Sequence, residues 1–356
     1  MQRILVTGGA GFIGSHTSLL LLENGYEIVV IDSFVNSSPL ALKRVEKILD
    51  NQNIKVGDKL KIFKGDLRNE NDIERVFFDF LREGKTIDAV IHFAGLKSVS
   101  ESFSNPIKYW DYNLIGTINL LKAMEKFSCF NIVFSSSATI YKPSKNKFLS
   151  EDEPISPINP YGATKVAIEN FLNDLQKSSN NIWRIAKLRY FNPIGAHHSG
   201  LIGESPLGLP NNIYPQLTKV ALGEIKELII YGDDWQTEDG TGVRDFIHVM
   251  DLAKGHLLVL EFLDRNPPQV LDLNLGTGNG TSVLELIKIF QEINKVKIPY
   301  VIGPRRKGDI DLVVADITRA KYKLNWEPEN SIDDMCKDGW NWQLQNPHGF
   351  SERAPN

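Results

Sequence analysis

The segment that most constrains the fold is a run of glycines near the start of the chain, at residues 8–14. It follows an apolar, β-branched run at residues 3–7 and precedes residues 15–24, whose apolar side chains recur at helical spacing. Glycines let the backbone turn tightly and approach a pyrophosphate, which the N-terminus of the next helix stabilises. The pattern predicts a strand, a helix and, between them, a phosphate-binding turn at Gly8, Gly11 and Gly14.

The next strand-like run, at residues 27–31, ends in Asp32. A carboxylate at the end of the second strand can accept hydrogen bonds from both hydroxyls of an adenine ribose, and it repels a 2′-phosphate. Strand, glycine turn, helix, strand and aspartate together predict a dinucleotide site. The cofactor is therefore expected to be NAD rather than NADP.

Three further apolar runs follow at the spacing of βα units. They lie at residues 60–64, 88–93 and 131–134, with helical patterns between them at residues 70–83 and 114–127. Alternating strands and helices predict an α/β fold with a Rossmann-type, doubly wound parallel sheet. Ligands then gather at the carboxyl ends of the strands.

Small or polar residues follow each of these strands, where a bound cofactor would pass. We expect the adenine to lie between Asp66 and Leu67, and the rest of the path to be lined by Phe93, Ala94, Gly95 and Lys97. Lys97 could instead be a solvated loop lysine. Asn113 is another candidate contact, although its expected place at the start of a helix also suits plain capping.

A phenol and an amine stand four residues apart at Tyr161 and Lys165, in the predicted first turn of a helix that runs to about residue 177. Positions i and i+4 share a helix face, so the ammonium is expected to lower the pKa of the phenol from about 10 toward working pH. Tyr161 would then act as a general base, and Ser137 could relay a proton to it from a substrate hydroxyl. The same spacing also occurs on amphipathic surface helices, and a serine can simply cap the end of a strand.

The composition limits the kinds of partner. The chain has 356 residues and a formal net charge of −4. This length suggests about two domains, and the lack of a basic excess argues against nucleic acid or a membrane as a partner. The two cysteines lack metal-ligand spacing, which predicts neither a metal site nor a disulfide framework and fits a reducing compartment. Without a signal segment or a long apolar run near its start, the chain is expected to be cytoplasmic.

The later part of the chain is expected to form a smaller α/β substrate domain. Residues 192–212 are rich in glycine and proline, which marks a departure from the parallel sheet. Arg244 and Arg306 are candidates for binding a phosphate, although both could be ordinary surface arginines. We expect an NAD-binding domain at residues 1–191 and about 243–276, a substrate domain at about 192–242 and 277–350, and a disordered tail at 351–356.

Eight stretches of the sequence read VTGGAGFIGSH, HFAGLKSV, FSSSATIY, YGATK, LRYFNPIGAHHSG, PNNIYPQ, TEDGTGVRDFIHVMDLA and PRRKGD. Through them the chain, over residues 3–350, resembles the UDP-glucose (UDP-galactose) 4-epimerases of the extended short-chain dehydrogenase/reductase superfamily. The glycine turn and the YxxxK spacing are typical of the superfamily, and the later stretches are specific to the epimerases. The sequence departs from the family pattern at Ser33, Tyr112 and Lys142, to which we assign no role.

By this resemblance, the catalytic residues are Ser137, Tyr161 and Lys165. The implied cofactor contacts are Gly8, Gly11, Phe12, Ile13, Gly14, Asp32, Asn36, Ser37, Asp66, Leu67, Phe93, Ala94, Gly95, Lys97, Asn113, Lys165 and Phe191. The implied contacts of the UDP-sugar are Ser137, Tyr161, Asn192, Asn212, Tyr231, Arg244, Arg306, Asp309 and Val313. A homodimer that pairs through the helices at residues 114–127 and 161–177 is implied as well.

The resemblance implies reversible C4 epimerisation of UDP-glucose and UDP-galactose through a 4-keto sugar, with enzyme-bound NAD. Val313 stands where a bulky tyrosine excludes an N-acetyl group, so N-acetylated UDP-hexoses are expected substrates too. The alternatives are another NAD-dependent nucleotide-sugar epimerase or decarboxylase, or a scaffold that binds NAD without catalysis. A 4,6-dehydratase would need an Asp-Glu pair directly after the active-site hydroxyl, where this chain has Ala138 and Thr139.

Overall fold

The fold starts with the strand, glycine turn and helix that the sequence predicts. β1 (Arg3–Thr7) is fully buried, α1 (Phe12–Glu23) follows the turn, and β2 (Glu27–Asp32) returns parallel to β1. Aliphatic and β-branched residues fill both strands, as expected for strands that are covered on both faces. This first unit places the end of β1 beside the end of β2.

The computed structural model describes residues 2–144, 146–178, 181–207, 210, 212–306 and 309–350. The predicted disordered tail at 351–356 lies outside the described residues. Within the described ranges, every helix is too short or too polar to cross a membrane.

Seven strands form one parallel sheet in the order β10-β6-β5-β4-β1-β2-β3. The strands not yet named are β3 (Leu60–Lys64), β4 (Ala89–His92), β5 (Asn131–Ser137), β6 (Arg184–Tyr190) and β10 (Val270–Leu275). The chain moves outward from β1 to β3, then returns to β4 on the other side of β1. The predicted Rossmann-type parallel sheet is therefore confirmed, and a parallel sheet carries its ligand site where the strand order reverses.

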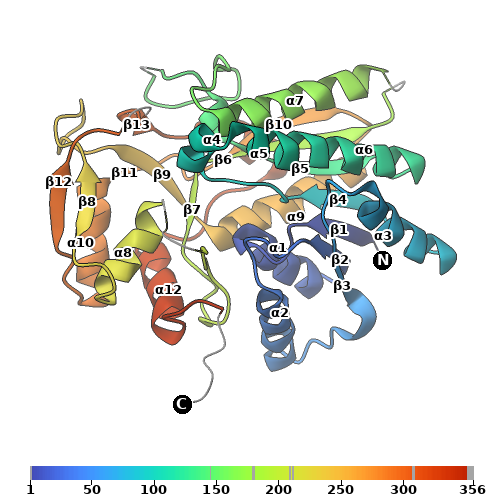
Figure 1. Cartoon of the computed structure of the whole chain (residues 1–356), viewed down its shortest axis with the longest axis horizontal. Coiled ribbons are helices and arrows are strands. Elements are labelled where there is room, and N and C mark those ends of the chain that lie inside the picture. The colour runs from blue at the N-terminus through green and yellow to red at the C-terminus, as the bar shows by residue number, and fades with distance from the viewer. Residues whose placement is uncertain are drawn as a thin grey trace.

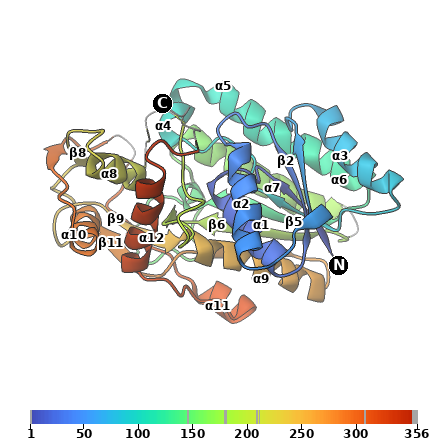
Figure 2. The same ribbon diagram turned by 90° about the horizontal axis from the view of Figure 1, so that it is seen from below.

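Two layers of helices cover the sheet (Figure 1). One layer contains α1, α2 (Pro39–Asn51) and α9 (Val249–Arg265), whose buried side chains share a core with β1, β2 and β10 (Figure 2). The opposite layer contains α3 (Glu70–Arg82), α6 (Gly116–Lys126) and α7 (Pro160–Ser178), which share a second core with β4 and β5. Three shorter helical segments, α4 (Val99–Ser104), α5 (Pro106–Tyr109) and the π-helix η2 (Trp110–Ile115), lead into α6.

The remaining elements form a smaller part with a core of its own. β7 (Asn192–Ile194), β9 (Val243–His248), β11 (Gly280–Ser282) and β13 (Leu312–Val313) make one sheet, and β8 (Leu228–Tyr231) pairs with β12 (Tyr300–Gly303). The helices here are α8 (Ile213–Ala221), α10 (Val283–Asn294) and α12 (Ile332–Gln345). One late helix, α11 (Thr318–Leu324), packs instead on α9 and β10 and shares the core of the larger part. Among the described residues, the 3₁₀ turns are η1 (Gly57–Lys59) and η3 (Ala138–Ile140). The division into two domains stays a prediction. The strand β9 pairs in the smaller sheet, whereas β10 is a strand of the larger sheet and α9 packs on that sheet.

The mixture of glycines with polar and charged residues at 239–251 predicts a loop that leads into another apolar run, and this prediction is wrong for part of the segment. It contains β9, and four of the six residues of that strand are buried. Arg244, Asp245 and His248 interrupt the apolar pattern of the strand, so its sequence does not show the alternation typical of a half-buried strand. The buried Asp245 carboxylate is stabilised instead by backbone N–H groups of Thr277, Gly278 and Ala315.

Candidate active site

The glycine turn between β1 and α1 is packed so closely that larger residues would not fit. Gly8 has a φ of 68°, and a Cβ atom there would lie 2.8 Å from the backbone nitrogen of Ala94. A Cβ on Gly14 would lie 2.4 Å from the carbonyl oxygen of Gly8. Gly11 is the N-cap of α1 and has no side chain to cover the first N–H groups of the helix. These groups suit an anion such as a pyrophosphate.

The Asp32 carboxylate is held next to this turn at the end of β2. Its Oδ2 accepts from the backbone N–H of Ala10 at 3.0 Å, and its Oδ1 accepts from the N–H of Phe34 at 2.9 Å and from the Ser37 hydroxyl at 2.8 Å. Ser37 therefore contacts Asp32 directly. The exposed Asn36 lies in the same loop. The predicted NAD residues of the first two strands thus come together around one turn.

The residues after β3 and β4 complete the predicted cofactor path. Leu67 is buried, and Asp66 forms an ion pair with Arg68 at 2.7 Å. The hydrogen bonds from Arg68 lower the pKa of Asp66. Phe93 packs its ring 4.8 Å from the ring of His256. Lys97 is not simply solvated, because its ammonium pairs with Glu204 at 2.7 Å.

Asn113 does not open a helix, as the sequence suggested. It lies inside η2, directly before α6, and is buried. Its amide nitrogen donates to the carbonyl of Leu96 and to the hydroxyl of Thr164, and its amide oxygen accepts from the N–H of Leu96. Asn113 thus ties the loop after β4 to α7, and its two N–H donors are both used within the protein.

Tyr161, Lys165 and Ser137 come together at the end of β5. Tyr161 and Lys165 lie on the first turns of α7, and the Lys165 ammonium is 5.8 Å from the centre of the Tyr161 ring. The Lys165 Nζ donates to the carbonyl of Ser135 at 2.7 Å. The Ser137 hydroxyl lies close enough to the Tyr161 phenol to lower the pKa of that phenol by hydrogen bonding. It also accepts from the N–H and the hydroxyl of Thr139, so its own proton can point toward the phenol oxygen.

The sequence predicts that Lys165 lowers the pKa of Tyr161. This prediction is wrong when only the groups of the protein act on the phenol. Burial raises the pKa of Tyr161 to about 12, and the Ser137 hydrogen bond lowers it only in part. Burial also lowers the pKa of Lys165 to about 8, so the ammonium is itself weakened as a source of positive charge. The sequence rule considers the pair as two exposed charges on a helix, whereas both groups are buried and desolvation dominates.

The two arginines predicted to bind a phosphate converge on the smaller part. Arg244 lies on β9 beside Val313 of β13. Burial lowers the pKa of Arg244, and this group is close enough to Asp309, Arg306 and Asp311 for their charges to affect it. Arg306 pairs with Asp309 at 2.9 Å. Arg306 also lies over the ring of Tyr231, 4.6 Å from its centre.

The other predicted substrate and cofactor residues lie between the Tyr161 cluster at the end of β5 and the Arg244 cluster of the smaller part, or beside one of them. Phe191 and Asn192 follow β6 directly, and Asn192 opposes Phe246 of β9. The short β7 therefore connects the end of the large sheet with the strand that carries Arg244. Phe12 and Ile13 begin α1, whereas Asn212 is an exposed residue at the N-cap of α8.

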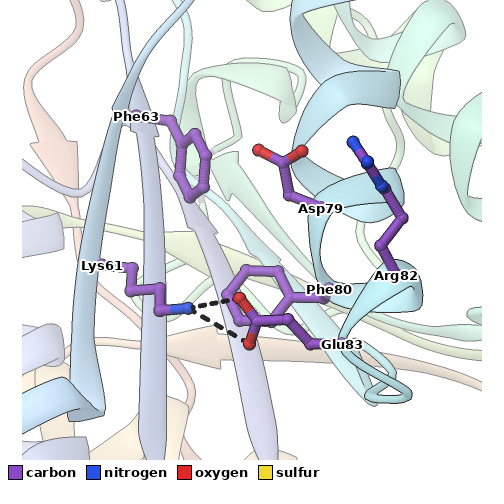
Figure 3. A pocket seen from close by; sticks show the side chains of 6 residues that line it. All are labelled: Lys61, Phe63, Asp79, Phe80, Arg82 and Glu83. Carbon is purple, nitrogen blue, oxygen red and sulfur yellow. Dashed lines mark hydrogen bonds and ion pairs between the residues drawn. The ribbon is translucent and has the colours of Figure 1, made fainter.

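A shallow surface hollow between β3 and the end of α3 lies elsewhere on the molecule (Figure 3). It is lined by Lys61, Phe63, Asp79, Phe80, Arg82 and Glu83, and the Lys61–Glu83 ion pair spans it at 3.1 Å. The α3 residues of the hollow lie in the last turns of the helix. These turns are near the amino ends of the strands, away from the carboxyl ends where ligands bind. We therefore place the active site at the glycine turn and the end of β5.

Comparison with known proteins agrees with this geometry. The GDP-mannose 4,6 dehydratase family matches residues 5–339. UDP-glucose 4-epimerase 2 of Arabidopsis thaliana is 48% identical to the chain and covers 99% of it, with 98% of the relative covered. UDP-glucose 4-epimerase of Bacillus subtilis is 48% identical, with 98% of this chain and 99% of the relative covered. A crystal structure of UDP-glucose 4-epimerase from Bifidobacterium longum, in complex with NAD+ and UDP, superimposes with a TM-score of 0.91 at 48% identity, covering 98% of this chain and 100% of that one.

The chain belongs to the UDP-glucose 4-epimerase family. The two residues that follow Ser137 bear on the alternative of a 4,6-dehydratase. Ala138 and Thr139 begin the turn η3, and Thr139 uses its N–H and hydroxyl to hold Ser137. Elimination of water needs an acid and a base at the sugar. An alanine and a threonine supply no carboxylate for that role.

Sequence reasoning about the epimerase site missed the partners that hold the catalytic candidates in place. The carbonyl of Ser135 fixes Lys165, and the Ser136 hydroxyl donates to Glu169 at 2.5 Å. Two signals in the sequence could have indicated them. Three serines stand in a row before Ala138, and Glu169 follows Lys165 by four residues, on the same helix face.

Proposed function

We propose that this chain interconverts UDP-glucose and UDP-galactose by inverting C4 of the hexose, with NAD bound throughout the reaction. It is then an isomerase. The observation that carries the proposal is the partly buried phenol of Tyr161, next to Ser137 and one helical turn from Lys165, at the end of the strand next to β4. Members of the family with this architecture carry the name UDP-glucose 4-epimerase.

The residues around the glycine turn fit NAD. A turn in which added Cβ atoms would clash with backbone, and a helix start at Gly11, suit the pyrophosphate. Asp32 suits the adenine ribose and disfavours a 2′-phosphate. When bound, NAD supplies a reversible two-electron acceptor at C4 and a positive charge that favours the Tyr161 phenolate.

The protein groups then move one proton in each direction. Tyr161 accepts the proton of the sugar 4-hydroxyl, through Ser137 or directly, while the C4–O bond becomes a carbonyl. Ser137 donates a hydrogen bond toward the reacting oxygen as charge develops there. After the 4-keto sugar has turned its other face, Tyr161 returns the proton and the hydroxyl re-forms in the inverted configuration.

The charged groups of the smaller part suit the diphosphate. Arg244 and Arg306 would bind the two phosphates, and Asp309 would orient Arg306 through their ion pair. A clamp on the diphosphate holds the substrate while the hexose turns. Assay of the purified protein with UDP-galactose and NAD, with UDP-glucose measured by chromatography, tests the function. Interconversion is expected, and its absence from a protein that retains NAD would overturn the proposal.

We also propose that N-acetylated UDP-hexoses are substrates. Val313 is partly buried beside Arg244 and is smaller than a tyrosine, which leaves room next to the sugar 2-substituent. We expect Val313→Tyr to lower kcat/KM for UDP-N-acetylglucosamine by about 100-fold, because one clash in a tight pocket costs about 3 kcal/mol. Turnover of UDP-galactose should change little in the same variant. Wild-type protein that turns over UDP-galactose but neither acetylated sugar would contradict the proposal.

We propose a homodimer whose interface includes the segments that lead into the implied helix at residues 114–127 and that pack on the implied helix at residues 161–177. Val99, Phe103, Ile107 and Trp110 form an exposed apolar stripe along α4, α5 and η2, and Ile107 is 84% exposed. These segments lie against the start of α7, in the outer layer of helices (Figure 1). Exposed apolar stripes of this kind mark interfaces. We expect Ile107→Glu to convert a dimer to a monomer in light scattering, whereas Ile302→Glu, on the exposed strand β12, should leave the mass unchanged.

A cytoplasmic location is also proposed. Cys129 and Cys336 are both buried free thiols. Proteins of reducing compartments keep cysteines in this form.

A further inference from the structure

The helix that carries Tyr161 and Lys165 presents a third polar residue on the same face. Tyr161, Lys165 and Glu169 follow one another at four-residue spacing, so they form one line along α7. They face three consecutive serines at the end of β5. Lys165 bonds to the carbonyl of Ser135, Glu169 bonds to the hydroxyl of Ser136, and the Ser137 hydroxyl is close enough to Tyr161 to lower its pKa.

Glu169 is a buried carboxylate on the helix of Lys165, and it pairs with two other buried cations. It is 1% exposed. Arg189 of β6 donates to both of its oxygens, at 3.1 Å and 2.7 Å, and the Lys187 ammonium lies 3.9 Å from Oε2. Both cations also pair with Asp272 of β10. Glu169 therefore links α7, the helix of Tyr161 and Lys165, to the cationic pair of Arg189 and Lys187 on the sheet.

This position gives Glu169 an electrostatic effect on Lys165. Burial lowers the pKa of Lys165 to about 8, and the Glu169 charge is the influence that raises it again. Without this carboxylate, burial would act on Lys165 with no opposing charge, and burial of an ammonium favours the loss of its proton.

We propose that Glu169 is a positioning residue that keeps Lys165 protonated and thereby sets the upper pH limit of the epimerase reaction. The proposal rests on the proposed function, in which a charged Lys165 supports the Tyr161 phenolate. Glu169 itself touches neither reacting atoms nor Tyr161, and it acts through Lys165 and the Ser136 contact.

The other groups that face Lys165 and Glu169 come from four strands and from the residue that follows η3. His92 of β4 lies near Lys165, and burial lowers the pKa of His92 to about 3, so it stays neutral. The ring of Phe134 on β5 lies 4.8 Å from the Lys165 ammonium. On β6, the Tyr190 hydroxyl lies close enough to Tyr161 for their charges to interact. The Tyr141 hydroxyl accepts from Arg189 behind Glu169, and the Asp272 carboxylate on β10 completes the set.

The decisive variant is Glu169→Gln, which keeps the shape and can still accept from Ser136. We expect the descending limb of kcat against pH to move toward acid by about one pH unit, which lowers kcat at pH 8 about fivefold. KM for UDP-galactose should be unchanged. Glu169→Asp restores the charge and should return the limb toward its wild-type position. Asp272→Asn, which removes a carboxylate from the same ion network on the side away from α7, should leave the limb in place.

The outcomes separate this proposal from the proposed function. A wild-type protein without turnover overturns the proposed function, whereas an active wild type and an active Glu169→Gln variant with the same descending limb overturn the role of Glu169. If circular dichroism shows that Glu169→Gln is unfolded, the double variant Glu169→Gln/Arg189→Gln leaves no buried charge of this ion pair unpaired. The descending limb of kcat against pH for this double variant should lie between the limbs expected for the wild type and for Glu169→Gln. A limb at the wild-type position again contradicts the proposal.

Discussion

Replacement of Tyr161 by phenylalanine is expected to lower kcat for UDP-galactose by about 1,000-fold, the usual size of a general acid–base contribution. The ring stays, so the packing against Lys165 and the start of α7 should persist. The variant lacks the phenol oxygen that, in the proposed function, exchanges a proton with the sugar. Ser137 then bonds only to Thr139 and the substrate, and it has no base behind it.

NAD content and thermal stability are the measurements that interpret this loss. Tyr161→Phe should keep both, because the glycine turn and Asp32 are unchanged. Tyr112→Phe removes one phenolic hydroxyl from a ring that lies under Arg68, 3.7 Å from its guanidinium carbon, and should keep full turnover. A Tyr161→Phe variant with wild-type kcat would contradict the role of Tyr161 as the base. Loss of turnover with unchanged biological activity would favour a scaffold.

The fold was predictable wherever the apolar pattern is undisturbed. Residues 3–7 and 60–64 match β1 and β3 because each strand is a short run bounded by turn residues. β9 escaped prediction because its polar residues are satisfied by distant partners. Asp245 bonds to backbone groups of residues 277, 278 and 315, which a pattern within one segment cannot show.

The members of the site were more predictable than their electrostatics. Spacing alone placed Tyr161 and Lys165 on one helix face, and their packing at the end of β5 agrees with it. The direction of the pKa shift depends on burial, which the i, i+4 rule does not contain. Asn113 shows the same limit, because its partners at Leu96 and Thr164 are brought to it by other elements of the fold.

A second large effect is expected below neutral pH, where buried histidines should destabilise the fold. Burial lowers the pKa of His16 and His92 to about 3, and that of His197 and His256 to about 4. In the unfolded chain a histidine has a pKa of about 6.5. The unfolded state therefore binds more protons than the folded state below pH 6.5, and stability falls as the pH decreases toward the folded values.

The magnitude follows from the linkage relation. At pH 5 each of these histidines costs about 2 kcal/mol of unfolding free energy. The four together approach the whole stability of a typical domain, about 5–15 kcal/mol. We therefore expect urea unfolding midpoints to be constant above pH 7 and to fall steeply between pH 6.5 and 5. Midpoints that stay level across that interval would show that these imidazoles can be charged in the folded state.

His256→Gln tests one contribution within this total. His256 Nδ1 donates to the carbonyl of Leu252 at 2.8 Å, so its Nε2 must accept from the Tyr190 hydroxyl, and a glutamine side chain offers both a donor and an acceptor. Between pH 7 and pH 5, the free energy of unfolding of the variant should fall by about 2 kcal/mol less than that of the wild type. This holds whatever the stability of the variant at pH 7. His198→Gln, at an exposed histidine, serves as the control and should keep the wild-type dependence on pH. A His256→Gln curve parallel to the wild-type curve would mean that the imidazole gains its proton without breaking the bond to Tyr190.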